Sequence, residues 1–130
     1  DSEMTPLEHF YEQGLAEEQA RSVLSQFQFN QDEAKMSIKS LSGGQRQRFT
    51  FLLLFKSNPE CIVLDEPTNN LDEKTWQLLL RLVNDYTGTL LLVTHDRAFI
   101  EQLRQPRFWL LKNRTVKESW ADLDELLTAL

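Results

Sequence analysis

Two short apolar runs separated by one amphipathic segment constrain the fold of this chain more than any other feature. Residues 61–64 and 89–93 are rich in Val, Ile and Leu, and each is short enough for a strand of a parallel sheet. Between them, residues 73–86 carry apolar side chains at helical spacing, and Thr87-Gly88 supplies a turn. This strand–helix–strand order predicts an α/β fold with parallel, buried strands. The helix is expected to turn four side chains inward: Trp76, Leu79, Leu80 and Val83.

The segment before the first strand is predicted to be helical. A capping box that runs from Thr5 to Glu8 starts a first helix, which Gly14 ends. Residues 15–27 have one apolar stripe and predict a second helix. Residues 28–40 are polar, and we expect them to form a loop.

A second capping box, Ser42-Gly43-Gly44-Gln45, opens a third helix that ends before Pro59. Beyond the second strand the pattern predicts, in order, a short helix, a hairpin and a closing helix: residues 96–104, residues 108–111 with 115–118, and residues 122–130.

Charge and composition exclude several classes. The 130 residues carry 14 Lys and Arg against 20 Asp and Glu, and residues 1–35 alone hold two bases and eight acids, so 2 − 8 = −6 is the whole net charge. That acidic segment is unsuited to contacting a phosphate backbone and is typical of a solvated helical face, the alternative being an acidic docking surface.

No apolar run approaches the roughly 18 residues of a membrane span, and the polar N-terminus predicts no signal peptide. The single cysteine, Cys61, excludes an internal disulfide framework and a cysteine-based zinc site. We therefore expect a cytoplasmic location.

The first motif that can serve binding or catalysis is Leu41-Ser42-Gly43-Gly44-Gln45. Two glycines at a helix start allow a phosphate to approach the backbone, where exposed N–H groups, the helix dipole and a hydroxyl can hold it. Taken by itself, the Ser-Gly-Gly triplet is better explained as an ordinary N-cap that contains glycine.

The second motif places Asp65 and Glu66 directly after the first apolar run and before Pro67. The carboxyl edge of a parallel sheet is where ligands bind in open α/β folds. Because side chains alternate along a strand, the two carboxylates diverge, so that one can hold Mg²⁺ and the other can take a proton from water. A helix cap or a salt-bridge partner is the alternative.

The third motif is Thr94-His95-Asp96, at the end of the second strand. A histidine there can contact a γ-phosphate or hold a water in line, although a structural role is the alternative. His9, on the first acidic helix, is interpreted as structural.

In this order and with these gaps, the motifs resemble the ATPase domain of the ABC superfamily. Residues 41–45 are similar to its signature motif, residues 62–66 to Walker B with the catalytic glutamate, residues 69–72 to the D-loop and His95 to the switch histidine. Residues 66–72 are close to the EPTNHLD pattern of the ABC-F branch, with Asn70 replacing histidine. Residues 88–97 and Phe99 are close to its GTxLxVSHDRxF pattern, with Thr94 replacing serine.

The resemblance implies roles for individual residues. Asp65 would hold Mg²⁺, Glu66 would be the general base for water and His95 would contact the γ-phosphate of ATP. Five further residues would bind or couple to the nucleotide of an opposite site, across a sandwich of two ATPase domains: Ser42, Gly43, Gly44, Gln45 and Asp72.

The chain contains no Gly-x-x-x-x-Gly-Lys-[Ser/Thr] loop, so nothing in it supplies the lysine for the β-phosphate. The resemblance therefore implies a partial P-loop NTPase core with parallel strands in residues 41–130, preceded by the remainder of the helical subdomain in residues 1–40. We expect such a piece to be inactive alone and to need the missing N-terminal half of the same domain as its partner.

Three functions are open at this stage. The first is an ABC-F ATPase that carries a second ATPase domain in the same chain and acts on the ribosome, as a translation or antibiotic-resistance factor. The second is the ATPase subunit of a membrane transporter, with a transmembrane partner. The third is a non-enzymatic piece that only displays the signature helix for pairing.

Overall fold

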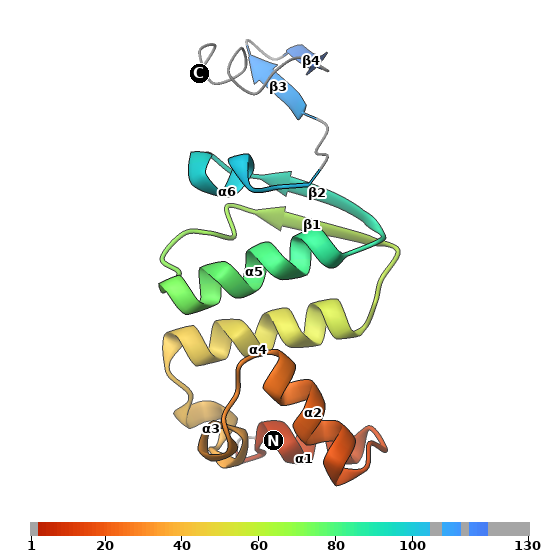
Figure 1. Ribbon diagram of the computed structural model, residues 1–130, viewed down its shortest axis with the longest axis vertical. Helices are drawn as coiled ribbons and strands as arrows, with labels where there is room; N and C mark the ends of the chain where they lie inside the picture. The colour runs from red at the N-terminus through yellow and green to blue at the C-terminus, as the bar shows by residue number, and fades with distance from the viewer. Residues whose placement is uncertain (1–2, 105–107, 113–114, 120–130) are drawn as a thin grey trace. The chain divides into compact units, whose positions relative to one another are not determined.

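The computed structural model describes residues 3–104, 108–112 and 115–119. The chain divides into two units, Asp1–His95 and Asp96–Leu130, and each is described by itself. Along the long axis of Figure 1, the first unit runs from three short helices to two long ones and then to a pair of strands.

The three short helices are α1 (Pro6–Glu12), α2 (Glu17–Gln26) and α3 (Gln31–Lys35), followed by the 3₁₀ turn η1 (Ile38–Ser40). The capping box of α1 is formed as predicted: the Glu8 N–H donates to the Thr5 hydroxyl over 3.1 Å, and the Thr5 N–H donates to the Glu8 carboxylate over 2.8 Å.

The prediction of a loop over residues 28–40 is wrong. Asn30 caps α3 by a full capping box with Glu33, with a 2.8 Å bond from the Glu33 N–H to the Asn30 side chain and a 2.9 Å bond in return. A short helix is stable here because its caps satisfy the end groups and because Ala34 is buried in the core.

The long helices are α4 (Gly43–Lys56) and α5 (Glu73–Asp85). Residues from α1, α2, α3, α4 and α5 and from the segments between them form one hydrophobic core: Leu7, Phe10, Ala20, Val23, Leu24, Phe27, Phe29, Ala34, Leu41, Phe49, Leu52 and Leu78. His9 packs its ring edge against Phe10 and Phe49, in agreement with the structural role expected for it.

The inward face of α5 differs from the predicted one. Leu79 and Leu80 are buried as expected, but Trp76 and Val83 are only partly buried. Thr75 and Leu78 are fully buried instead. The helix α5 lies between α4 and the strands in Figure 1, so side chains on two of its sides are covered.

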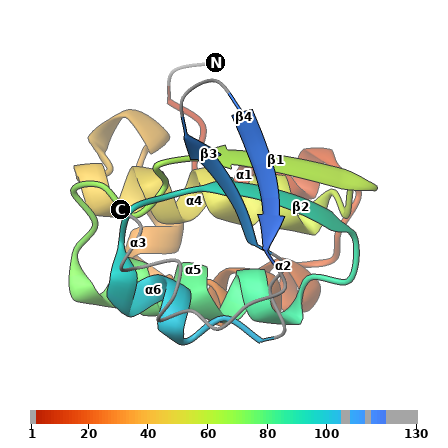
Figure 2. The same cartoon turned by 90° about the horizontal axis from the view of Figure 1, so that it is seen from above.

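The strands β1 (Cys61–Asp65) and β2 (Thr89–Val93) pair in parallel, with Cys61 opposite Thr89 and Asp65 opposite Val93. Figure 2 shows the two strands running side by side. The predicted α/β fold with parallel strands is thus confirmed. Asp72 provides a hydrogen-bonded cap for α5.

The prediction that both strands are buried is wrong for one face of the pair. Ile62 and Leu64 are buried, whereas Val63 is 63% exposed and its neighbour Leu91 is 46% exposed. The reason is that strand side chains alternate, and the described residues of the first unit cover only the face that carries Ile62 and Leu64.

The second unit contains α6 (Arg97–Glu101), which is shorter than predicted, and the antiparallel strands β3 (Phe108–Lys112) and β4 (Thr115–Ser119). These strands confirm the predicted hairpin. The helix predicted for residues 122–130 lies outside the described residues. Within the ranges that the structure describes, no helix is both long and apolar enough to cross a membrane.

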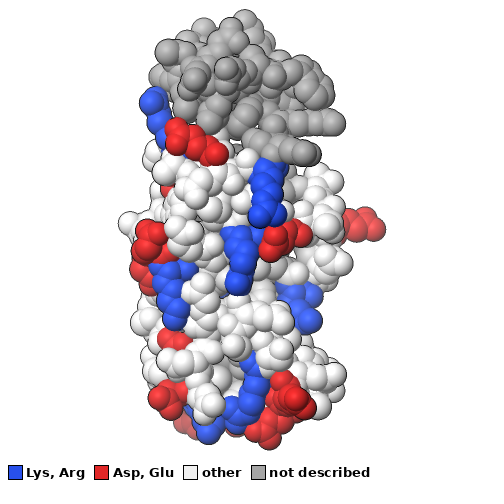
Figure 3. All heavy atoms as spheres, viewed as in Figure 1, with Lys and Arg blue, Asp and Glu red and all other residues white. Residues whose placement is uncertain are grey.

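Charges are mixed rather than gathered on the face drawn in Figure 3. Lys and Arg side chains alternate there with Asp and Glu, also at the end formed by α1, α2 and α3. On this face, the acidic first segment therefore does not present a surface of one sign.

Candidate active site

The glycine turn, residues 42–45, forms the start of α4. Ser42 is the N-cap: its hydroxyl accepts from the Gln45 N–H over 3.2 Å, and the Gln45 side chain accepts from the Ser42 N–H over 2.7 Å. The 14 residues of α4 direct their positive dipole end and their first N–H groups at this turn. The turn is therefore chemically suited to hold an anion.

The two glycines of the turn face different surroundings. A Cβ atom added to Gly43 would meet nothing within 4 Å, whereas one added to Gly44 would lie 2.5 Å from Oδ2 of Asp72. A side chain at Gly44 would therefore force the Asp72 carboxylate to shift. Gly43 instead leaves open space at the helix start.

Asp72 is the N-cap of α5, and its Oδ1 accepts from the Thr75 N–H over 2.7 Å. Hydrogen bonding by Thr75 lowers the pKa of the Asp72 carboxyl, and the charges of Arg48 and Lys74 lower it further. Asp72 therefore carries its negative charge beside the glycine turn.

A buried ion pair that the sequence reasoning missed joins these elements. Arg48 on α4 is only 3% exposed, and its Nη2 donates to Oε1 of Glu33 on α3 over 3.0 Å. Its Nη1 lies 4.0 Å from Oδ2 of Asp72, and its guanidinium lies over the Phe29 ring, 5.5 Å from the centroid. The same Oε1 of Glu33 accepts from the Gln45 side chain over 2.9 Å.

We call these four residues the Asp72 cluster: Glu33, Gln45, Arg48 and Asp72. Burial by itself would raise the pKa of Glu33, but the Asn30 and Gln45 hydrogen bonds and the Arg48 and Lys74 charges together hold that pKa below its usual value. The Asn30-x-x-Glu33 capping pattern was a signal that could have revealed α3, although nothing local indicates that Arg48 reaches it.

The second group of predicted residues lies where β1 and β2 end, and we call it the edge cluster: Asp65, Glu66 and His95. Glu66 has a φ of 46°, in the left-handed region that a non-glycine residue adopts only at a cost. Its N–H donates to the Val93 carbonyl over 2.7 Å, which continues the pairing of the two strands by one residue.

The structure brings Glu66 and His95 together. Nδ1 of His95 lies 2.9 Å from Oε1 of Glu66, and the ring of His95 is largely exposed. The other carboxylate oxygen of Glu66, Oε2, is buried and has no hydrogen-bond partner among the described residues. Gln28 also combines a left-handed φ, 63°, with a buried oxygen that has no partner among the described residues, so what distinguishes Glu66 is its contact with His95 at the sheet edge.

Mg²⁺ binding is compatible with this edge. Mg²⁺ is usually held by one or two carboxylates together with water and substrate phosphates, and Asp65 ends β1 with an exposed carboxylate. Among the described residues, no group of three or more His, Cys, Asp or Glu could form a cage made only of protein ligands.

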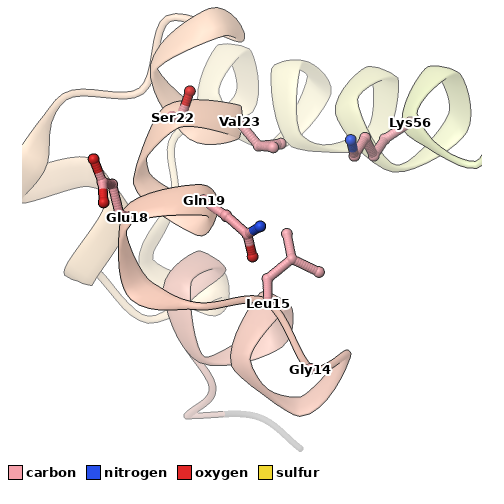
Figure 4. A pocket seen from close by; sticks show the side chains of 7 residues that line it. All are labelled: Gly14, Leu15, Glu18, Gln19, Ser22, Val23 and Lys56. Carbon is pink, nitrogen blue, oxygen red and sulfur yellow. The ribbon is translucent and has the colours of Figure 1, made fainter.

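A shallow pocket lies away from both clusters. It lies between the turn after α1, the helix α2 and the C-terminal end of α4, and Figure 4 shows the side chains around it. Its lining contains none of the predicted site residues: Gly14, Leu15, Glu18, Gln19, Ser22, Val23 and Lys56.

Comparison with known proteins shows the family to which this chain belongs. Residues 1–69, more than half of the chain, match the family model described as ABC transporter. The ATP-binding protein YheS of Haemophilus influenzae is 36% identical over 109 residues, which are 84% of this chain and 17% of that protein. The ATP-binding protein Uup of Escherichia coli is 44% identical over 78 residues, which are 60% of this chain and 12% of that protein.

Solved structures agree. A dimer of the ATP-binding cassette MJ0796 bound to ADP and Pi has a TM-score of 0.57 and 31% identity, and the match covers 79% of this chain and 46% of that one. A cobalt transport ATP-binding protein with 22% identity has a TM-score of 0.65, which shows the shared fold. The chain thus spans about half of a solved cassette and about a sixth of the length of its curated relatives.

Proposed function

The chain belongs to the ABC transporter family, and we propose that it is part of a larger ATP-binding and ATP-hydrolysing protein of the ABC-F type. The observation that carries the hydrolytic role is the 2.9 Å contact between Glu66 and His95 at the carboxyl edge of the parallel strands. Asp65, the last residue of β1, directly precedes this pair.

In the proposed reaction, Glu66 is the general base. His95 occupies Oε1 of Glu66, so Oε2 is the oxygen that takes a proton from the attacking water. His95 contacts the γ-phosphate, which places the transferred group and the base within reach of one another. Asp65 holds Mg²⁺, which when bound would neutralise charge on the phosphates.

The glycine turn serves a second, opposite site in the proposed protein. The open space at Gly43 and the dipole of α4 suit it to receive the γ-phosphate of an ATP that another ATPase domain holds. Gly44 and Gln45 contribute to the same contact, and Asp72 couples it to the neighbouring site. The second ATPase domain and the half of the cassette that carries a P-loop are therefore the required partners.

Without a P-loop, we propose that the 130-residue chain does not bind ATP alone. For the complete protein we favour the ribosome as partner and the cytoplasm as location, because the motifs resemble the ABC-F branch and the relatives are named ATP-binding proteins. The alternative is that the complete protein is the ATPase subunit of a transporter, since the cassette fold by itself is compatible with that function too.

Replacement of one carboxylate oxygen of Glu66 by an amide nitrogen tests the hydrolytic role. In the full-length protein that contains this chain, Glu66→Gln should lower ATP turnover by about a hundredfold or more, the range expected for loss of a general base. Nucleotide binding should persist, because the amide keeps the size of the side chain. Glu60→Gln, which changes an exposed acid just before β1, is the matched control and should leave turnover within about twofold.

Turnover that survives in Glu66→Gln would refute the proposed base. The same variant also tests the partner, since ATP-bound protein that cannot hydrolyse should accumulate on its target. Sedimentation with ribosomes in ATP, but not in ADP, is the expected result. Retention on membranes that contain a transporter, with none on ribosomes, would favour the alternative.

A further inference from the structure

Arg48 is the most deeply buried charged side chain described in the core, and the reaction proposed above does not use it. It lies in the first half of α4, one turn after the glycine turn. Burying a guanidinium that is 3% exposed costs free energy unless it is paired and hydrogen-bonded. The residues that pair with Arg48 therefore indicate its role.

Those partners come from both sides of α4. Glu33, from α3, accepts from Arg48 over 3.0 Å, and Asp72, at the start of α5, lies 4.0 Å from the other terminal nitrogen. Phe29 covers the guanidinium plane at 5.5 Å. The planar fork of arginine can address two carboxylates at once, which a lysine ammonium on a single stem does less well.

The same contacts reach the glycine turn. Gln45 donates one hydrogen bond to Glu33 and accepts another from the Ser42 backbone. Glu33 therefore holds both Arg48 and the glycine turn. On the other side, the Asp72 carboxylate lies so close to Gly44 that a Cβ atom would collide with it. Arg48 is thus placed between the turn and the cap of the next helix.

We propose that Arg48 is a positioning residue that fixes the glycine turn and Asp72 relative to each other, so that both move as one piece. Glu33 holds the guanidinium in place from α3. The consequence for hydrolysis rests on the proposed function: a turn that has slipped from Asp72 would close poorly on the nucleotide of the opposite site.

Arg48→Lys in the full-length protein tests the proposal, since lysine keeps the charge but loses the fork. Amide hydrogen exchange should rise about tenfold in two peptides, residues 41–47 and 72–78, as expected when a charge-assisted hydrogen bond is lost locally. Exchange in α1 and α2 should remain unchanged. Arg21→Lys, at the exposed Glu17–Arg21 pair, is the matched control and should alter neither peptide.

A kinetic measurement separates positioning from mere stability. Arg48→Lys should lower kcat about tenfold at saturating ATP while KM stays within about twofold, because the residue does not contact the nucleotide of its own site. Arg48→Met, which keeps volume but removes the charge, should be worse than Arg48→Lys in both measurements.

Unchanged exchange in both peptides of Arg48→Lys would overturn the proposal, as would exchange raised equally along the whole chain. An Arg48→Lys variant whose exchange and kcat are no closer to wild type than those of Arg48→Met would overturn it as well. If the wild-type protein does not hydrolyse ATP, the proposed function fails. The exchange experiment still decides whether Arg48 couples the turn to Asp72.

Discussion

The Asp72 cluster and the edge cluster carry the same kinds of side chain but are built in opposite ways. In the first, carboxylates meet a buried arginine, a glutamine and helix N–H groups at 2.7 to 4.0 Å, and the pKa values of Glu33 and Asp72 are lowered as a result. In the second, Glu66 adopts a left-handed φ of 46° and keeps a buried oxygen without a partner among the described residues.

Each cluster keeps one buried atom without a partner among the described residues, Nε of Arg48 in the first and Oε2 of Glu66 in the second, so the two differ in charge pairing and in backbone strain. A cluster whose charges are paired stabilises the helices that contain it. A cluster with a strained backbone and an unsatisfied oxygen lowers the stability of the fold and leaves a hydrogen-bond acceptor for a ligand or a water. The exposed apolar face of β1 and β2 beside the edge cluster, with Val63 63% exposed, agrees with a region that other parts of a larger protein complete.

Loss of the Glu33 charge should give the largest effect on folding. Glu33→Gln should lower the free energy of unfolding of the chain by about 1.5–3 kcal/mol at pH 7, the range for hydrogen bonds to charged groups. The reason is that Arg48 remains buried with a weaker partner. Urea unfolding measures the change, and Glu17→Gln, which alters the exposed Glu17–Arg21 pair, should cost less than about 0.5 kcal/mol.

The Glu33 effect should depend on pH in one direction. The folded-state pKa of Glu33 lies below its ordinary value of 4.5, so its ionised form stabilises the fold above that value. The contribution is lost as the pH falls through the lower folded-state pKa. Wild type and Glu33→Gln should therefore converge in stability in acid, and a gap that persists at the lowest pH would show that packing, not charge, explains the loss.

The two glycines should respond to the same substitution with opposite signs. Gly44→Ala should destabilise the chain by about 1–2 kcal/mol, because the new methyl displaces the Asp72 carboxylate and weakens the cap of α5. Gly43→Ala should stabilise it by about 0.5 kcal/mol, since there is space for the methyl and φ is not left-handed. Equal effects in thermal unfolding would contradict the close approach of Asp72 to Gly44.

Local signals account for most of what the sequence predicted. The capping boxes at Thr5 and Ser42 and the cap at Asp72 depend on residues three positions apart, and the parallel strands follow from two apolar runs around a helix. The motifs placed Glu66 and His95, 29 residues apart, at the ends of the two predicted strands, and the structure brings their side chains into contact.

The parts that the sequence did not reveal depend on packing between distant segments. Glu33 and Arg48 are 15 residues apart, and their pairing exists only because α3 folds back on α4. The exposed face of β1 and β2 could not be foreseen either, since a run such as residues 61–64 has the same apolar composition whether one face or both are covered.

The smallest effect on stability is expected at the edge cluster. His95→Ala should change the free energy of unfolding by less than about 1 kcal/mol, because the His95–Glu66 contact joins a side chain that is 76% exposed to one that is 31% exposed. In the full-length protein, the same substitution should lower ATP turnover strongly, since His95 is proposed to contact the γ-phosphate. Urea unfolding and steady-state ATPase assays measure the two quantities, with Gln102→Ala on the next helix as a control that should change turnover little. A large loss of stability in His95→Ala without a loss of turnover would reverse the comparison, because the edge would then be structural and the Asp72 cluster would become the better candidate for the chemistry.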